Sequence, residues 1–301
     1  MSVRRSRGSR RRTNRGNVST PKTSHTKKQT TRAQALKKVE KIYSEPRYED
    51  FIKKLGKAAK DPKVKAVLLG GLIDGRKTDD IIKNTTIMRM SKNLTPIQQE
   101  IDLESSLKWI GRHPENVPLI LRGGTLDQKN FGGVPIVTSY GSYIVDGHHR
   151  WSQVYMINPE ARLESINLQI EDPKAALRES QIAIAALSGK VPTSRIQPSK
   201  NIYTMNPKQI RVLTPKYLSP QFYEAFYKTY PRRYKTPADV EDHIYRNIMK
   251  MRLQNPPQTD IDRSLMPQYS AVGVTRGTYA LQRGRVNIKP PYSKPRKTRK
   301  Q

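Results

Sequence analysis

The sequence predicts an α+β protein whose folded part lies between two basic, disordered ends. Short apolar runs typical of strands alternate with helical spacing between residues 86 and 190. Helical spacing without strand-like runs occupies residues 32–85 and 191–255. Lys, Arg, Ser, Gly and Pro without apolar periodicity fill residues 1–31 and 256–301. We therefore expect a mixed sheet with helices, a helical segment on each side of it, and a basic tail at each end.

The charge of this 301-residue chain is unevenly distributed. The formal net charge is +32, and the first 39 residues contain 13 Lys/Arg and no acidic residue. Residues 263–301 contain 10 Lys/Arg and again no acidic residue. Residues 86–172 carry 8 basic and 10 acidic residues, a net charge of −2. The pattern indicates a near-neutral domain that carries two polycationic ends.

Such ends favour a polyanionic partner, because neutralising phosphates releases condensed counterions. DNA or RNA is the expected partner, while an anionic membrane, an acidic protein, or a solubilising or nuclear-targeting tail are the alternatives. The residues predicted to contact nucleic acid are the densest basic clusters of the two ends: Arg4, Arg5, Arg7, Arg10, Arg11, Arg12, Arg296, Lys297, Arg299 and Lys300.

Several functional classes are excluded by composition. The chain has no cysteine, which excludes disulfides, thiolate metal sites and a cysteine nucleophile. No apolar run reaches the length of a membrane span, and no apolar segment follows the basic N-terminus as in a secretory signal. We expect an intracellular, nucleic-acid-associated location, in a nucleoid, a nucleus or a virion.

The helical segment 32–85 is predicted as two amphipathic helices separated by Pro46. Two glycines, Gly70 and Gly71, interrupt the apolar run that follows them. The stretch up to Lys77 resembles a phosphate-binding loop only superficially, because it lacks P-loop spacing. A turn between helices is the simpler interpretation.

Between residues 86 and 190 the predicted elements follow one another closely. Thr95-Pro96 predicts a helix start, with an N-cap and a proline in the first turn. A second helix is expected to begin near Gly147, and a last one to run from Pro173 to Gly189. The predicted strands are 87–90, 117–121, 134–138, 143–145 and 165–170.

Residues 191–255 are predicted to be helical and rich in aromatic residues. Tyr223, Phe226, Tyr227 and Tyr230 form a stripe at helical spacing. The stripe is interpreted as packing against the preceding domain rather than as a base-stacking platform. A further helix is expected over 237–253.

Most of the potential chemistry lies at Asp146-Gly147-His148-His149-Arg150, after the strand 143–145. A strand-to-helix junction of this composition can hold an anion: helix N–H groups are free, Gly147 allows close approach, and Arg150 can add a charge-assisted fork. Alternatively, Asp146 and Arg150 pair across the turn as a structural salt bridge. The adjacent histidines alone form a poor metal pair.

Two motifs make residues 86–188 resemble the ParB/sulfiredoxin superfamily. Residues 94–101, Leu-Thr-Pro-Ile-Gln-Gln-Glu-Ile, are similar to the family's opening L-x-P-T-Q-x-E element, with Ile97 in place of the common threonine. Residues 146–150 look like the D-G-H-H-R form of its phosphate-binding turn. The resemblance covers about a third of the chain. It implies a mixed-sheet α+β fold with nucleotide phosphates at the start of the helix that follows the turn.

The resemblance also implies roles for particular residues. Gly147, His148, His149 and Arg150 would contact phosphate, and Asp146 would orient a histidine or help to hold Mg²⁺. Glu100 matches a glutamate that assists phosphoryl transfer in the kinase branch, so Glu100, Asp146 and His148 are the expected catalytic residues. The sulfiredoxin activity needs a cysteine that this chain lacks. The partition branch carries a helix-turn-helix after its core, and residues 190–255 show no clear version of it.

The sequence thus suggests a nucleic-acid-associated protein whose core binds a nucleoside triphosphate with Mg²⁺ and hydrolyses it or transfers its phosphoryl group. One alternative is a structural packaging protein of a virion or nucleoid with a non-catalytic core. Another is a ParB-like nuclease, which ranks lower because no carboxylate cluster for two metals is present.

Overall fold

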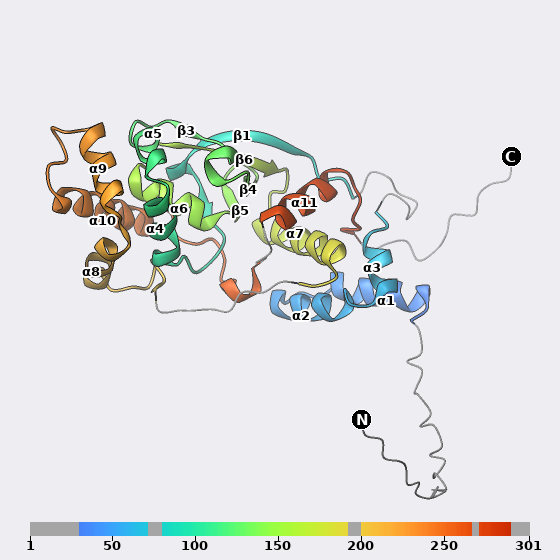
Figure 1. Cartoon of the computed structure of the whole chain (residues 1–301). Coiled ribbons are helices and arrows are strands. Elements are labelled where there is room, and N and C mark those ends of the chain that lie inside the picture. The colour runs from blue at the N-terminus through green and yellow to red at the C-terminus, as the bar shows by residue number, and fades with distance from the viewer. Residues whose placement is uncertain (1–29, 72–79, 192–199, 267–270, 290–301) are drawn as a thin grey trace, which may run out of the picture.

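A mixed β-sheet lies between two groups of helices (Figure 1). The computed structural model describes residues 30–71, 80–191, 200–266 and 271–289. Helices and strands combine in one α+β fold, as the sequence predicts.

The sheet combines parallel and antiparallel pairs in the order β1-β6-β4-β5-β2, with β3 also paired to β6. Pairs β1/β6 and β4/β5 are antiparallel, whereas β2/β5, β3/β6 and β4/β6 are parallel. The short central strands have side chains buried on both faces, as expected where helices cover both sides of a sheet. The strands are β1 Asn84–Met90, β2 Thr95–Pro96, β3 Thr125–Leu126, β4 Ile136–Ser139, β5 Tyr143–Asp146 and β6 Arg162–Leu168.

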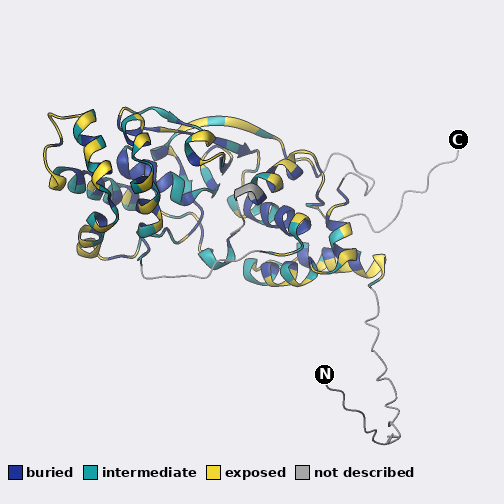
Figure 2. Cartoon of the chain, viewed as in Figure 1, coloured by how far each residue is buried: buried dark blue, intermediate teal, exposed yellow. Residues whose placement is uncertain are grey.

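Alternation along the central strands divides the core into two parts. Ile136 and Ile144 belong to one apolar cluster, and their neighbours Val137 and Val145 belong to the other. Successive side chains of a strand point to opposite faces, so each face receives one set. Figure 2 shows the dark, buried residues on both sides of the sheet.

The first cluster joins one face of the sheet to the helices of the central and C-terminal segments. Trp151 and Tyr155 are among its largest fully buried side chains. The helices that contribute to it are α4 Leu103–Arg112, α5 Val117–Leu121, α6 His148–Ile157, α8 Pro207–Tyr217, α9 Pro220–Thr229 and α10 Pro237–Gln254.

The second cluster joins the other face to the N-terminal helices and to a C-terminal helix. Helix α7 is its centre, since it packs against α2, α3 and α11. Its helices are α1 Arg32–Tyr43, α2 Tyr48–Ala58, α3 Pro62–Leu68, α7 Pro173–Ser188 and α11 Ala271–Gln282. The 3₁₀ turns of the described chain are η1 Ser91–Asn93, η2 Pro114–Asn116, η3 Gln128–Phe131 and η5 Arg263–Leu265.

Many predicted elements are confirmed. The strands near 87–90, 134–138, 143–145 and 165–170 are present, and Gly189 ends α7 with a φ of +74°. Pro46 separates α1 from α2. Of the aromatic stripe, Tyr223, Phe226 and Tyr227 of α9 pack in or against the first cluster, whereas Tyr230 follows the helix and is exposed. The loop from 72 to 77 lies outside the described residues.

Two elements differ from the prediction. Residues 117–121 form helix α5 rather than a strand, because Pro118 suits a first helical turn and Val117, Ile120 and Leu121 reach the core from one helical face. Thr95 and Pro96 do not start a helix; they pair with Tyr143 and Ile144 as strand β2. The helix begins later, at Leu103, where the Asp102 carboxylate caps it by accepting a bond from the Ser105 N–H.

The boundary of the predicted C-terminal tail also changes. Residues 256–266 and 271–289 belong to the fold, with Ile261, Met266, Leu281 and Val286 buried in the second cluster. Five of the ten Lys/Arg assigned to this end therefore lie on folded elements. Apolar spacing in α11 is sparse, since Gly273 and Gly277 lie within it. Apolar periodicity in the sequence therefore does not indicate a helix there.

Candidate functional site

The predicted strand–turn–helix motif is present. Strand β5 ends at Asp146, Gly147 turns the chain with a φ of +100°, and α6 begins at His148. This left-handed conformation favours glycine, because a Cβ there would crowd the backbone. No side chain caps the first turn of α6, which leaves backbone N–H groups of the helix N-terminus without the usual side-chain acceptor.

Arg150 folds back over this turn. Its Nη2 lies 2.6 Å from Asp146 Oδ2, and its Nη1 donates to the Val134 carbonyl at 2.7 Å. The Arg150 and Asp146 side chains are only 17% and 22% exposed. Burial raises the pKa of Asp146, and the Arg150 charge opposes that shift. The structural salt bridge considered from the sequence is thus formed.

The space above Gly147 is filled by this guanidinium. A Cβ added to Gly147 would lie 3.0 Å from Ile136 Cγ1 and 3.1 Å from Arg150 Nη2. The missing side chain therefore admits Arg150 rather than leaving an open approach to the backbone on that side.

Both histidines fasten the neighbouring segment to α6. The Nε2 atom of His148 accepts the Gln98 N–H at 3.3 Å, and that of His149 accepts the Asp102 N–H at 3.3 Å. Burial is the main cause that lowers the pKa of His148 to about 3 and that of His149 to about 4. Both rings are therefore neutral near pH 7, with Nε2 already occupied as an acceptor.

Glu100 follows β2 in a loop that approaches the same junction. Its Oε2 atom is buried and has no hydrogen-bond partner among the described residues. Burial and the Asp262 charge raise the pKa of Glu100, whereas Arg263 lowers it. The helix predicted to start at Thr95-Pro96 would have included Glu100, but residues 97–102 are not helical.

Arg263 is the residue that the sequence interpretation missed. Its charge lowers the pKa of both His148 and His149, and its Nε atom is buried without a hydrogen-bond partner in the described chain. It was assigned to a tail because no apolar period surrounds it. The available signal was Asp262, whose carboxylate caps the short turn η5 by accepting from the Ser264 N–H.

Backbone contacts bring Arg263 to this place. The Gln258 N–H donates to the Pro96 carbonyl at 2.9 Å, and the Thr259 hydroxyl donates to the Ile97 carbonyl. At the end of η5, Gln181 of α7 donates to the Leu265 carbonyl at 3.0 Å. The start of the segment 258–266 thus lies alongside residues 96–99, a stretch that His148 holds against α6 through Gln98.

The described residues contain no group of three or more His, Asp or Glu side chains arranged to hold a metal ion. Asp146, the expected Mg²⁺ ligand, is bonded to Arg150. What the junction offers instead is an uncapped helix N-terminus and the charge of Arg263, which acts on His148 and His149 at the start of α6. The basic clusters expected to contact nucleic acid, between Arg4 and Arg12 and between Arg296 and Lys300, lie outside the described residues.

Comparisons with known proteins do not identify this chain: no protein-family model, curated protein or solved structure matches it. Within the described ranges, none of the helices is both long and apolar enough to span a bilayer.

Replacing Gly147 by alanine should lower the free energy of unfolding by about 2–4 kcal/mol, from left-handed strain plus crowding against Ile136 and Arg150. Gly132→Ala is the matched control, because Gly132 has a φ of +68° but no heavy atom within 4 Å of an added Cβ. It should lower stability by only about 1–2 kcal/mol. Urea unfolding of both variants measures the difference; equal losses would contradict the packing of Arg150 over Gly147.

The two histidines should stay neutral well below the usual pKa of imidazole. Their folded-state pKa values lie below the unfolded value of about 6.5. They therefore contribute stability that is fully present above about pH 6.5 and is lost as the pH falls toward their folded values. NMR of the imidazole signals, assigned with His148→Asn and His149→Asn, should show neutral rings at pH 5. Midpoints between pH 6 and 7 would contradict their burial.

Proposed function

We propose that this chain is a nucleic-acid-associated protein. The observation that carries the proposal is the charge outside the described fold: residues 1–29 contain 10 Lys/Arg, residues 290–301 contain 5, and neither contains an acidic residue. The remaining 30–289 still have a net charge of +17. Self-repulsion of this size destabilises a compact state, whereas a polyanion offsets it and releases counterions on binding. The location proposed with this function is a nucleoid, a nucleus or a virion.

The full chain should bind DNA and RNA oligonucleotides with little sequence preference, and affinity should fall steeply with salt. Removing 1–29 and 290–301 takes away 15 positive charges. If five of these contact phosphates, the slope of log K against log[salt] flattens by about 4.5 on duplex DNA. Fluorescence anisotropy from 50 to 400 mM salt measures both slopes. Identical slopes would show that the ends are not the binding surface.

A second proposed function concerns the junction at α6: binding of a nucleotide phosphate. Two observations favour it: the N-terminus of α6 is uncapped, and Arg263, whose charge acts on His148 and His149 there, has a buried Nε without a partner among the described residues. A helix N-terminus and a guanidinium both favour an anion. The resemblance to the ParB/sulfiredoxin superfamily supports the same ligand, a nucleoside triphosphate with Mg²⁺, and stays part of this proposal.

In this proposal the residues divide their roles. The first-turn N–H groups of α6 and Arg263 hold the phosphate, while Arg150 and the two histidines shape the turn through the bonds they already make. Mg²⁺ would come bound to the nucleotide, since Asp146 is paired with Arg150, and would neutralise charge on the phosphates. Glu100, with its unpartnered Oε2, is the side chain proposed to accept a proton if turnover occurs.

The rival proposal is a packaging protein with a non-catalytic core. The bonds of Asp146, His148 and His149 favour it, because these side chains hold structure and would have to release their partners before acting on a ligand. Phosphate release at saturating nucleotide and Mg²⁺, with and without nucleic acid, separates the two. A bound but unhydrolysed nucleotide supports the packaging protein.

Arg263→Gln should weaken nucleotide binding by about 1.5–3 kcal/mol, the range for a hydrogen bond to a charged group. Glu100→Gln is the matched control, because it removes a negative charge beside the same site and should leave affinity unchanged or raise it. Calorimetric titration with ATP, CTP and GTP in the presence of Mg²⁺ measures both. Unchanged affinity in Arg263→Gln, in a protein whose wild type binds, would remove Arg263 from the site.

A further inference from the structure

A groove lined by lysines lies along α1, α2 and the turn that leads to α3. It has a volume of about 760 Å³, and five lysines line it: Lys38, Lys41, Lys54, Lys57 and Lys60. It belongs to the helical group on the opposite side of the sheet from the main body of α6, and none of its lining residues takes part in the junction described above.

Helical spacing places the lysines of each helix on the face that lines the groove. Lys38 and Lys41 are three residues apart on α1, and Lys54 and Lys57 are three residues apart on α2. Residues at this separation share one helix face. Lys60 follows in the turn before α3, so three segments direct their charges into the same groove.

The two carboxylates of the groove are already paired. Glu45 accepts from Lys54, and Asp61 Oδ2 lies 3.0 Å from Lys38 Nζ. Lys41, Lys57 and Lys60 have no ion pair within the described part of the chain. The groove therefore has a net charge of +3, contributed by three exposed ammonium groups.

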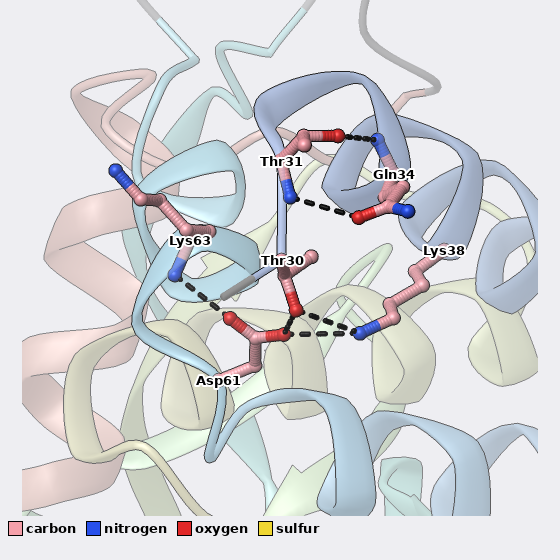
Figure 3. A network of polar contacts seen from close by, with 6 residues as sticks. All are labelled: Thr30, Thr31, Gln34, Lys38, Asp61 and Lys63. Carbon is pink, nitrogen blue, oxygen red and sulfur yellow. Dashed lines mark hydrogen bonds and ion pairs between the residues drawn. The ribbon is translucent and has the colours of Figure 1, made fainter. Parts of the chain in front are cut away.

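Asp61 also anchors the start of the fold beside this groove, as Figure 3 shows. The Thr30 hydroxyl donates to Asp61 Oδ2 at 2.6 Å, and the Lys63 N–H donates to Asp61 Oδ1 at 3.0 Å. The hydrogen bond from Thr30 is the main cause that lowers the pKa of Asp61 to about 2, with Lys38 and the Lys63 N–H adding to it. The carboxylate stays ionised, so Thr30, the residue that follows the basic segment 1–29, is held at the groove.

Charge decides what can occupy the groove. The segment 1–29 joins the fold at its edge, but its 10 Lys/Arg make it a poor occupant of a cationic groove. Residues 290–301 are excluded for the same reason, with 5 Lys/Arg and no acidic residue. The occupant must bring negative charge repeated over several ångströms, so that it meets Lys41, Lys57 and Lys60 together.

We infer that this groove binds the phosphate backbone of a nucleic acid, with Lys41, Lys57 and Lys60 as the contacting residues. The inference rests on the proposed nucleic-acid association and assigns part of that binding to a surface of the folded domain. Lysines act as point charges that contact phosphates without reading bases. Binding at the groove is therefore independent of sequence and is weakened by salt.

The test uses the full chain with the triple substitution Lys41→Gln, Lys57→Gln and Lys60→Gln. Each phosphate contact on duplex DNA contributes about 0.9 to the salt slope, so three lost contacts flatten the slope by about 2.7. Affinity for a 20-base-pair duplex at 0.1 M salt should fall on the order of 100-fold. The matched control is Lys129→Gln, Lys208→Gln and Lys216→Gln, which removes three exposed lysines outside the groove. The control should lose less than about fivefold, because separated surface charges are screened.

The outcomes separate this inference from the function on which it rests. A wild type that does not bind any oligonucleotide overturns the proposed nucleic-acid association itself. A wild type that binds, with equal losses in the groove and control variants, overturns the groove alone. Thermal melting should be unchanged in both variants, since the substituted side chains are exposed.

A vesicle experiment distinguishes the other polyanionic surface. Sedimentation with vesicles of 70% phosphatidylcholine and 30% phosphatidylserine is compared for the wild type and the groove variant. A groove variant that loses vesicle binding but keeps oligonucleotide affinity would overturn the inference in favour of a membrane surface. Loss of oligonucleotide affinity beyond that of the control supports it.

Discussion

The junction between β5 and α6 positions the rest of the structure. Gly147 turns the chain into α6, and Arg150 then binds both Asp146 and the Val134 carbonyl, which ties α6 to β5 and to the segment before β4. His148 and His149 accept backbone N–H groups from 98 and 102, so the segment before α4 is held to the same turn. These bonds require unprotonated Nε2 atoms, and burial keeps both rings neutral. A buried donor or acceptor that lost its partner would destabilise the fold by about 1–3 kcal/mol.

The same junction limits the chemistry that the core can perform. The polar side chains of the 146–150 motif are largely used for structure. The groups that remain are the backbone N–H groups at the start of α6 and two side chains from elsewhere, Glu100 from the loop after β2 and Arg263 from η5. A motif that resembles a phosphate-binding turn can therefore hold a fold together, and in our proposal distant segments supply the charge for its anion site.

Positive charge is arranged in two separate settings. Around α6 it is sparse and partly buried, which suits one small anion. Along α1 and α2 it is dense and exposed, and the acidic side chains beside it are already paired with Lys38 and Lys54. Solvent screens exposed charges beyond about 8–10 Å, so such a surface acts through several simultaneous contacts rather than one strong bond. We propose different ligands for the two settings, a nucleotide phosphate for the first and a nucleic-acid backbone for the second.

Local patterns in the sequence determined the α+β class and most strands, because the apolar period is set by residues close in the chain. They also determined the turn at Gly147, where glycine adopts a positive φ, and the ends of α7, where Pro173 begins the helix and Gly189 ends it. Tertiary structure decided whether Thr95-Pro96 became a strand, since β5 offered a pairing partner, and whether residues 117–121 became a helix, since the core lay on one side. It also decided that Arg263 stands beside α6. Residues 96–99 and 258–261 bond to each other across more than 150 positions, and no local period records such a contact.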